Sequence, residues 1–153
     1  MDVKLVNPFI NATVKVLETM AGTKANPGKP YVKKDKVARG DVTGLIGITG
    51  EANGTISVTF DEGSILGIVS RMFGERQKSL NDEISDAVGE LTNMISGQGR
   101  RKLEQDGRHF QAAIPSVISG KDHVINHITS GPIIAIPFST DGGRFTIEIC
   151  LEA

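Results

Sequence analysis

Residues 42–60 read VTGLIGITGEANGTISVTF and contain the clearest structural signal in the chain. The first run alternates in two sets, Val42, Gly44, Ile46 and Ile48 against Thr43, Leu45 and Gly47, and residues 55–60 repeat the same period of two. Alternation of this kind indicates strands that are buried on one face. Asn53-Gly54 lies between the two runs, and this dipeptide is typical of a tight hairpin turn. We therefore predict an antiparallel hairpin whose turn is at residues 53–54.

Helices are predicted on either side of this hairpin. The earlier one begins at Asn7-Pro8, with Asn7 as the N-cap and Pro8 at the first helical position, and ends at Gly22. The later one follows the hairpin directly, with Asp61 as its N-cap and Gly74 at its end. Apolar residues recur at helical spacing in both segments, which predicts that each helix packs one side on a core.

The rest of the chain is predicted to be largely β-structure. Residues 109–119, 132–139 and 144–151 are rich in β-forming residues, and Asp141-Gly142-Gly143 predicts a second hairpin turn. Residues 31–37 predict a polar strand at the edge of the sheet. Its three lysines disfavour pairing with another chain: Lys33, Lys34 and Lys36. A helix followed by strands and a hairpin occurs twice, which suggests two similar halves. We expect one α+β domain over residues 1–153, a largely antiparallel sheet of about six strands with about three helices packed on it and two pseudo-repeated halves.

The composition excludes several classes of protein. The 153 residues are 39 % hydrophobic and 23 % charged, which fits a globular domain. A net charge of −1 and few aromatic residues (six Phe, one Tyr, no Trp) argue against nucleic-acid binding. No apolar run approaches the roughly 20 residues of a membrane span, and the N-terminus lacks the pattern of a signal peptide. We expect a cytoplasmic protein that binds neither nucleic acid nor membrane.

No set of residues predicts a metal site or a nucleophile within the chain. Zinc needs three or four ligands of fixed geometry, whereas His123 and His127 stand in a β-prone run and His109 is near them only in sequence. Cys150 is the single cysteine, which excludes a disulfide framework, and it lacks a His and Asn set to activate it. Gly120-Lys121 lacks the preceding glycine of a phosphate-binding loop. We expect no metal and no cofactor bound by the chain itself.

The longest helix is predicted from about Asn81 to Gln105, with Ser79 or Asn81 as its N-cap. Its apolar residues recur on one side, which predicts the face that packs on the core: Ile84, Val88, Leu91 and Ile95. A second group lies more than a quarter-turn away on the helix, and we call it the polar ridge: Asp86, Glu90, Asn93 and Gly97.

The polar ridge contains residues that disfavour a helix. Asn93 is a poor helix former, and Gly97 and its neighbour Gly99 each cost about 1 kcal/mol relative to Ala. Glu90 and Asn93 are spaced i and i+3, so their side chains are neighbours on the helix surface. Glycines here are explained if another backbone or a partner protein approaches closely. Alternatively, the helix ends or kinks near Gly97 and the ridge is an ordinary solvated face, and the residues alone leave both interpretations open.

Residues 90–97, ELTNMISG, resemble the E-x-x-N-M-I-x-G helix of the CheC/CheX/FliY phosphatases of bacterial chemotaxis. Residues 114–123, IPSVISGKDH, resemble the strand and turn that follow this helix in CheX members. Members of the CheC type carry two such motifs, whereas residues 18–21 of the first predicted helix, ETMA, lack the Asn. The single motif therefore indicates the CheX branch of the family.

The resemblance implies a function and a role for each ridge residue. Such proteins dephosphorylate a phosphorylated CheY-type receiver, in which water attacks an aspartyl phosphate and Mg²⁺ is supplied through the receiver. Asn93 then positions the water, Glu90 pairs with a receiver lysine, and three residues contact the receiver: Asp86, Met94 and Gly97. The resemblance also implies a homodimer. A non-catalytic adaptor of the same fold, docking on a receiver or a flagellar-switch protein in chemotaxis or another response, is the alternative.

Overall fold

The computed structural model describes residues 3–127 and 131–152. Within these residues an eight-stranded sheet has the strand order β1-β7-β8-β4-β3-β5, and β2 and β6 pair with β7 and β3, respectively. All pairs are antiparallel, as predicted. The sheet has eight strands where about six were predicted, because two short strands, β1 and β2, pair with β7, and two others, β5 and β6, pair with β3. The strands are β1 (Asn26–Pro27), β2 (Tyr31–Lys33), β3 (Val42–Gly50), β4 (Asn53–Phe60), β5 (Phe110–Ala112), β6 (Ser116–Ser119), β7 (Ile133–Ser139) and β8 (Arg144–Glu152).

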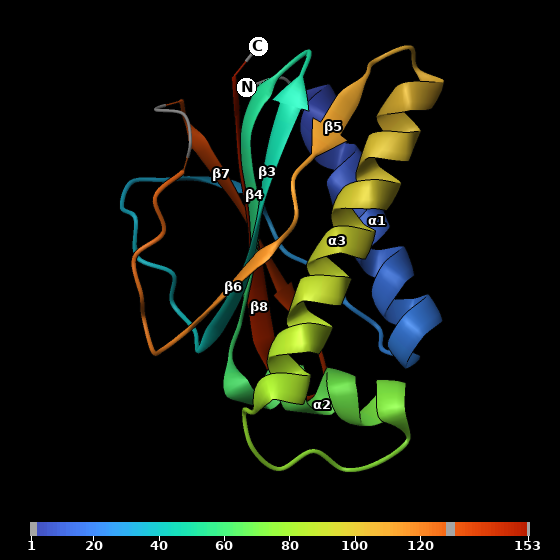
Figure 1. The fold of residues 1–153 in the computed structure, drawn as a ribbon, viewed down its shortest axis with the longest axis vertical. Coiled ribbons are helices and arrows are strands. Elements are labelled where there is room, and N and C mark those ends of the chain that lie inside the picture. Colours follow the sequence, from blue (N-terminus) through green and yellow to red (C-terminus); the bar gives the residue numbers. More distant parts are fainter. Residues whose placement is uncertain (1–2, 128–130, 153) are drawn as a thin grey trace.

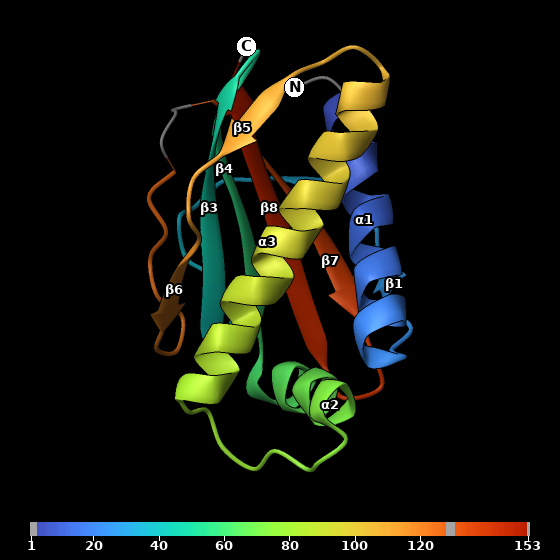
Figure 2. The same ribbon diagram turned by 45° about the vertical axis from the view of Figure 1, so that its right-hand side comes forward.

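Three helices of the described ranges lie on the same side of the sheet: α1 (Val3–Ala21), α2 (Glu62–Phe73) and α3 (Asp82–Gln105). Helices α1 and α3 lie side by side, and α2 crosses the end of the sheet near the start of α3 (Figures 1 and 2). Loops 34–41 and 120–127 lie on the opposite side of the sheet (Figure 1). The core between helices and sheet contains large, fully buried side chains such as Phe9, Leu17, Ile56, Ile65 and Leu91. None of the described helices combines the length and the apolar character needed to span a bilayer.

The topology agrees with the predicted two halves. Helix α1 is followed by two short strands that pair with β7 and then by the hairpin β3–β4. Helix α3 is followed by two short strands that pair with β3 and then by the hairpin β7–β8. Each half therefore adds its short strands to the other half's hairpin, and β4 and β8 join the halves at the centre of the sheet.

The predicted helix ends are correct except at the start of α1. Asp61 caps α2 by accepting a hydrogen bond from the Ser64 N–H at 2.7 Å, and Gly74 ends it in the left-handed conformation. Gly22 likewise follows the last residue of α1 with a φ of 54°. The prediction that Asn7-Pro8 starts α1 is wrong, because the helix begins at Val3 and contains Pro8. Burial of apolar residues before the proline offsets the loss of one backbone hydrogen bond: Leu5 and Val6.

The turn predicted at Asn53-Gly54 is also wrong in position. Ile48 pairs with Gly54, so Asn53 and Gly54 belong to β4 and the turn lies between Gly50 and Asn53. Gly50 adopts a φ of 120° there, a conformation that favours glycine. Gly54 is required for another reason, because a Cβ at this position would overlap the backbone carbonyl of Cys150 in β8. Strand packing, and not turn geometry, explains this glycine.

The predicted edge strand is shorter than residues 31–37. Strand β2 ends at Lys33, and Val37 forms only an isolated bridge with Val124. The β-rich run 109–119 is divided into β5 and β6, with Pro115, which has no N–H to donate to a ladder, between them.

Candidate functional site

Helix α3 is anchored at its start and along its buried side. The Asn81 side chain accepts a hydrogen bond from the Ile84 N–H at 3.0 Å, so Asn81 and not Ser79 is the N-cap. Asp82 and Glu83 follow in the first turn, where carboxylates favour the helix dipole. The predicted core stripe is confirmed, since all four of its side chains are at most 1 % exposed: Ile84, Val88, Leu91 and Ile95.

Close packing with β3 and α1 then fixes how α3 lies. The buried Thr92 hydroxyl donates to the Val88 carbonyl at 2.7 Å and lies against Gly44 of β3, where a Cβ would overlap it. Near the other end, Gly99 lies against the ring of Phe9 in α1 so closely that a Cβ would overlap the ring. Gly99 is thus explained by contact within the chain, whereas no such contact explains Gly97 on the polar ridge.

The polar ridge lies on the outer side of this fixed helix. Glu90 and Asn93 are exposed, as is Asp86, and Met94 and Gly97 are partly exposed. Among the described residues, neither the Glu90 nor the Asn93 side chain takes part in a hydrogen bond or an ion pair. The backbone under both residues is held rigidly, while their polar groups remain available to another molecule.

Gly97 does not end the helix, so the alternative prediction that α3 stops there is wrong. Helix α3 continues to Gln105, and Gly97 is not among the residues with a positive φ. A Cβ at Gly97 would meet only the ends of two flexible side chains, those of Arg100 and Arg101, each at 3.9 Å. The surface beside Glu90 and Asn93 is therefore open at this point, and a larger residue would fit there within the chain itself.

Residues 42–139, well over half of the chain, match the sequence profile of the family described as "Chemotaxis phosphatase CheX". The chain belongs to the CheX family. The curated CheY-P phosphatase CheX of Thermotoga maritima is 32 % identical over 140 residues, which cover 91 % of this chain and 89 % of that protein. These matches confirm the resemblance seen in residues 90–97 and 114–123, and with it the phosphatase class.

Solved structures extend the similarity to CheX-family folds. A CheC-like superfamily protein from Shewanella sp. PV-4 has a TM-score of 0.94 at 46 % identity, with 100 % of both chains covered. The chemotaxis protein CheX from Vibrio vulnificus has a TM-score of 0.91 at 50 % identity, with 97 % of this chain and 99 % of that chain covered. A CheX–CheY–BeF₃–Mg²⁺ complex from Borrelia burgdorferi matches with a TM-score of 0.81 at 25 % identity, over 97 % of each chain.

The other candidate residues of this CheX-family chain serve its structure. His123 lies with Nε2 2.6 Å from the Thr43 hydroxyl and Nδ1 2.7 Å from the Gly120 carbonyl, so it fastens loop 120–127 to the sheet. Asp122 has a φ of 52° and accepts a hydrogen bond from the Gly40 N–H, which makes it a turn residue. In residues 3–127 and 131–152, no three His, Cys, Asp or Glu side chains gather as they would around a metal ion.

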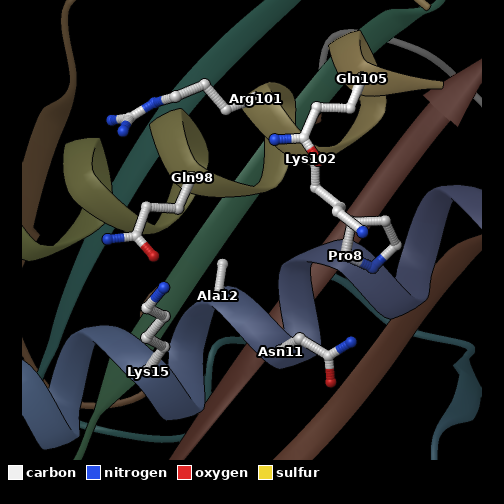
Figure 3. A pocket seen from close by; sticks show the side chains of 8 residues that line it. All are labelled: Pro8, Asn11, Ala12, Lys15, Gln98, Arg101, Lys102 and Gln105. Atoms are coloured by element: carbon white, nitrogen blue, oxygen red, sulfur yellow. The ribbon is translucent and has the colours of Figure 1, made fainter. Parts of the chain in front are cut away.

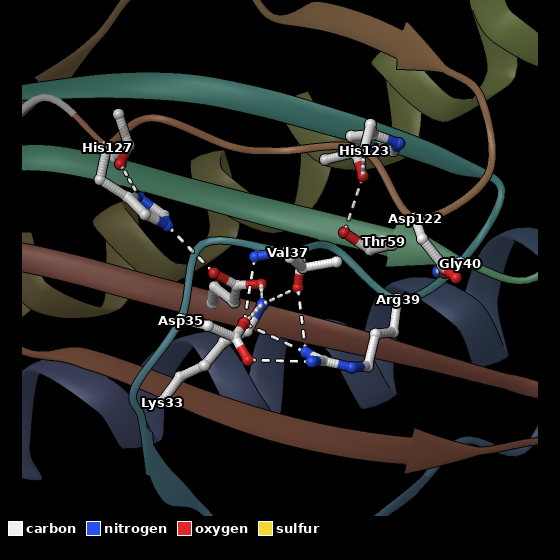
Figure 4. A network of polar contacts seen from close by, with 12 residues as sticks. Lys33, Asp35, Val37, Arg39, Gly40, Thr59, Asp122, His123 and His127 are labelled. Atoms are coloured by element: carbon white, nitrogen blue, oxygen red, sulfur yellow. Dashed lines mark hydrogen bonds and ion pairs between the residues drawn. The ribbon is translucent and has the colours of Figure 1, made fainter.

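Sequence reasoning missed a buried polar network under the loops, which Figure 4 shows from close by. Lys33 Nζ lies 2.6 Å from Glu148 Oε2, and His127 Nε2 lies 3.1 Å from Glu148 Oε1. His127 Nδ1 contacts the Thr55 hydroxyl on its other side. Lys33 is therefore not a solvated residue of the edge strand, in contrast to Lys34, because its side chain is only 9 % exposed.

The network holds Glu148 in its charged form. Burial alone raises the pKa of the Glu148 carboxyl, but the hydrogen bonds from His127 and Lys33 outweigh burial and hold the pKa below its ordinary value. The alternation of residues in β8 places Glu148 on one face of the strand. The residues near it in sequence do not indicate that its partners come from β2 and from loop 120–127. The side chains of the network are nearly inaccessible, which makes it a structural cluster and not a second active site.

Proposed function

We propose that this protein hydrolyses the aspartyl phosphate of a phosphorylated CheY-type receiver, and that the polar ridge of α3 is the part that enters the receiver's active site. The observation that carries this proposal is the pair Glu90 and Asn93, exposed side by side on a rigid helix without a partner in the described chain. Membership of the chemotaxis phosphatase family supports it. The CheX–CheY–BeF₃–Mg²⁺ complex supports a receiver as the partner.

In the reaction, the oxygen of a water attacks phosphorus and the bond between phosphorus and the aspartyl oxygen breaks. The products are the free carboxylate and inorganic phosphate, with the excess proton released to solvent. Phosphoryl transfer depends on positioning and on stabilisation of charge more than on covalent help, so the phosphatase needs no nucleophile of its own. The Asn93 carboxamide accepts one hydrogen bond from the water and holds it in line with the phosphorus.

Glu90 and the neighbouring residues orient the receiver. The Glu90 carboxylate pairs with a lysine at the receiver's active site, and this pair sets the register of docking more than it adds affinity. Asp86 and Met94 extend the contact surface on either side, and Gly97 lets the receiver's backbone come close to α3. We assign Mg²⁺ to the receiver, consistent with the Mg²⁺ named in the Borrelia complex and with the absence of a ligand cluster in the described residues.

We further propose that the protein acts in the cytoplasm as a homodimer in chemotaxis signalling. The lysines of the edge strand disfavour pairing there, whereas the run after Gly120 exposes an apolar side chain that supports self-association, that of Val124, which is 57 % exposed. Light scattering on the purified protein tests the dimer, and a monomer at micromolar concentration contradicts it.

The release of inorganic phosphate from a phosphorylated receiver tests the function. We expect substoichiometric protein to accelerate release through many turnovers, and a chelator that removes Mg²⁺ to stop it. Binding to the phosphorylated receiver without acceleration indicates the non-catalytic adaptor instead. Several receivers are compared side by side, because the cognate one is recognised by the largest kcat/KM.

A further inference from the structure

A groove of about 370 Å³ separates α1 from α3, just beyond the polar ridge, and Figure 3 shows it from close by. We call it the α1–α3 groove. It is lined by residues of both helices: Pro8, Asn11, Ala12 and Lys15 from α1, and Gln98, Arg101, Lys102 and Gln105 from α3. Lys15 points across it toward Gln98. The close packing of Gly99 on Phe9 sets the separation of the two helices at the groove.

Apart from Pro8 and Ala12, the side chains that line the groove carry groups that bind anions or can donate hydrogen bonds to them. Lys15, Arg101 and Lys102 are cationic, and the lining also includes three carboxamides, but no Asp or Glu side chain. Among the described residues, none of the three cations takes part in an ion pair or a hydrogen bond. The chain as a whole has a net charge of −1, so this concentration of positive charge is local. Ammonium, guanidinium and carboxamide groups are the donors that carboxylates accept from most readily.

The groove is continuous with the polar ridge. Arg101 follows Glu90 by three helical turns, about 16 Å along the axis, and lies on the same side of α3. Gln98 follows Gly97 directly and borders the groove. A protein that covers Glu90, Asn93 and Gly97 and extends along α3 toward its C-terminus therefore meets the groove next.

We infer that the α1–α3 groove receives an acidic segment of the phosphorylated receiver, so that the receiver is held at two places, by the ridge at its active site and by the groove beside it. This inference rests on the proposed function. The ridge is acidic at Asp86 and Glu90 and the groove is basic, so the charge of the surface changes from negative to positive along α3. A receiver can match both charges in only one orientation. Lys15 matters most to the argument, because it comes from α1, which the catalytic motif does not include.

Charge reversal on both sides of the groove tests the inference. The variant Lys15→Glu/Lys102→Glu changes two exposed side chains and leaves the polar ridge intact. We expect KM for the phosphorylated receiver to rise about tenfold at low salt while kcat stays within about twofold, since peripheral charges act on encounter and docking. The neutral variant Lys15→Gln/Lys102→Gln is expected to show a smaller rise and a weaker dependence of KM on salt.

The matched control is Lys34→Glu/Lys36→Glu, which makes the same change of charge in the loops on the opposite side of the sheet. We expect its KM to stay near that of the wild type. An equal rise in the control, or an unchanged KM and salt dependence in the groove variant, overturns the inference. So does saturable binding of inorganic phosphate to the wild type that is lost in the groove variant without any change in receiver affinity, because the groove then serves a free anion.

A titration keeps this test separate from that of the proposed function. Affinity for a receiver loaded with Mg²⁺ and fluoroberyllate is measured without turnover for the wild type, for Lys15→Glu/Lys102→Glu and for the control Lys34→Glu/Lys36→Glu. If the wild type releases no phosphate, the proposed function fails, but a lower affinity of the groove variant alone still supports the groove. If the wild type turns over and the charge-reversed groove variant binds the receiver as well as the Lys34→Glu/Lys36→Glu control does, only the groove inference fails.

Discussion

The two sides of the sheet carry polar residues in opposite states. On the loop side, Lys33, His127 and Glu148 are buried and satisfy one another at 2.6–3.1 Å. On the helix side, Glu90 and Asn93 are exposed, and neither side chain has a partner among the described residues. The buried cluster contains residue types that suggest catalysis, yet a substrate cannot reach it. The ridge is open to another molecule, but its side chains make no polar contacts with the rest of the described chain.

The difference teaches how to separate structural from functional polar groups in this fold. A buried charge is stabilised by partners within the chain, so its removal acts first on folding. An exposed carboxamide without a partner adds almost nothing to folding, so its removal acts on whatever the surface contacts. Substitutions on the two sides should therefore affect different measurements.

Asn93→Ala is expected to have the largest effect. Removing a preorganised hydrogen-bonding group from an active site lowers kcat by about a hundredfold to a thousandfold. Stability should be unchanged or slightly higher, because Asn93 is exposed and Ala is the better helix former. Phosphate release and thermal unfolding are measured on the same sample, with Glu83→Ala as an exposed control in the first turn of α3. Full turnover by Asn93→Ala contradicts the water-positioning role.

Glu148→Gln tests the loop side of the comparison. It removes the buried carboxylate that neutralises the Lys33 ammonium and leaves only the Val37 carbonyl and the more distant Asp35 as its partners. We expect the free energy of unfolding to fall by about 3 kcal/mol. The same substitution at the exposed Glu152 of the same strand should change it by less than about 0.5 kcal/mol.

The pH dependence of the wild type follows from the lowered pKa of Glu148. A carboxyl whose folded-state pKa is below its unfolded value stabilises the fold above the unfolded value, about pH 4. This contribution is lost as the pH falls through the lower, folded-state pKa. Chemical unfolding measured between neutral and acidic pH should show a smaller acid-induced loss in Glu148→Gln than in the wild type, and equal losses would argue against the network.

Gly97→Leu compares two glycines of one helix. We expect it to keep or raise the thermal stability, by up to about 1 kcal/mol, because the site is open and Leu is a better helix former. Receiver binding and turnover should fall by about a hundredfold, since a displacement near 1 Å moves Asn93 out of line. Gly99→Leu is the control and should lower stability, because its side chain would overlap Phe9. Normal binding by folded Gly97→Leu protein rejects the contact surface.

Glu90→Ala is expected to have the smallest of these effects. Loss of one charge that orients a partner should weaken receiver affinity by about tenfold and reduce the salt dependence of binding. Titrations at two salt concentrations measure both quantities. If the variant binds and turns over like the wild type at low salt, Glu90 is only a solvated residue.

Local sequence was sufficient for most of the helices and long strands and for the position of the ridge. Period-two alternation gave β4 and β8, and the caps Asp61, Gly74 and Asn81 set helix ends, because these signals depend on neighbours within a few residues. The spacing of Glu90 and Asn93 placed both on the outer side of α3 for the same reason. Local rules failed at Pro8 and at Asn53-Gly54, where burial of Leu5 and Val6 and the packing of Gly54 on β8 outweighed them.

Contacts between distant segments decided the features that local sequence rules do not predict. Gly97 and Gly99 look alike in sequence, and only the position of Phe9 on α1 shows that one is required by the core and the other is not. Lys33, His127 and Glu148 are separated by up to 115 residues along the chain and meet because β2 and loop 120–127 converge on β8. The α1–α3 groove likewise belongs to neither helix alone. Sequence periodicity reports which side of an element is buried, whereas the partner that buries it depends on contacts between distant segments, which form only when the chain folds.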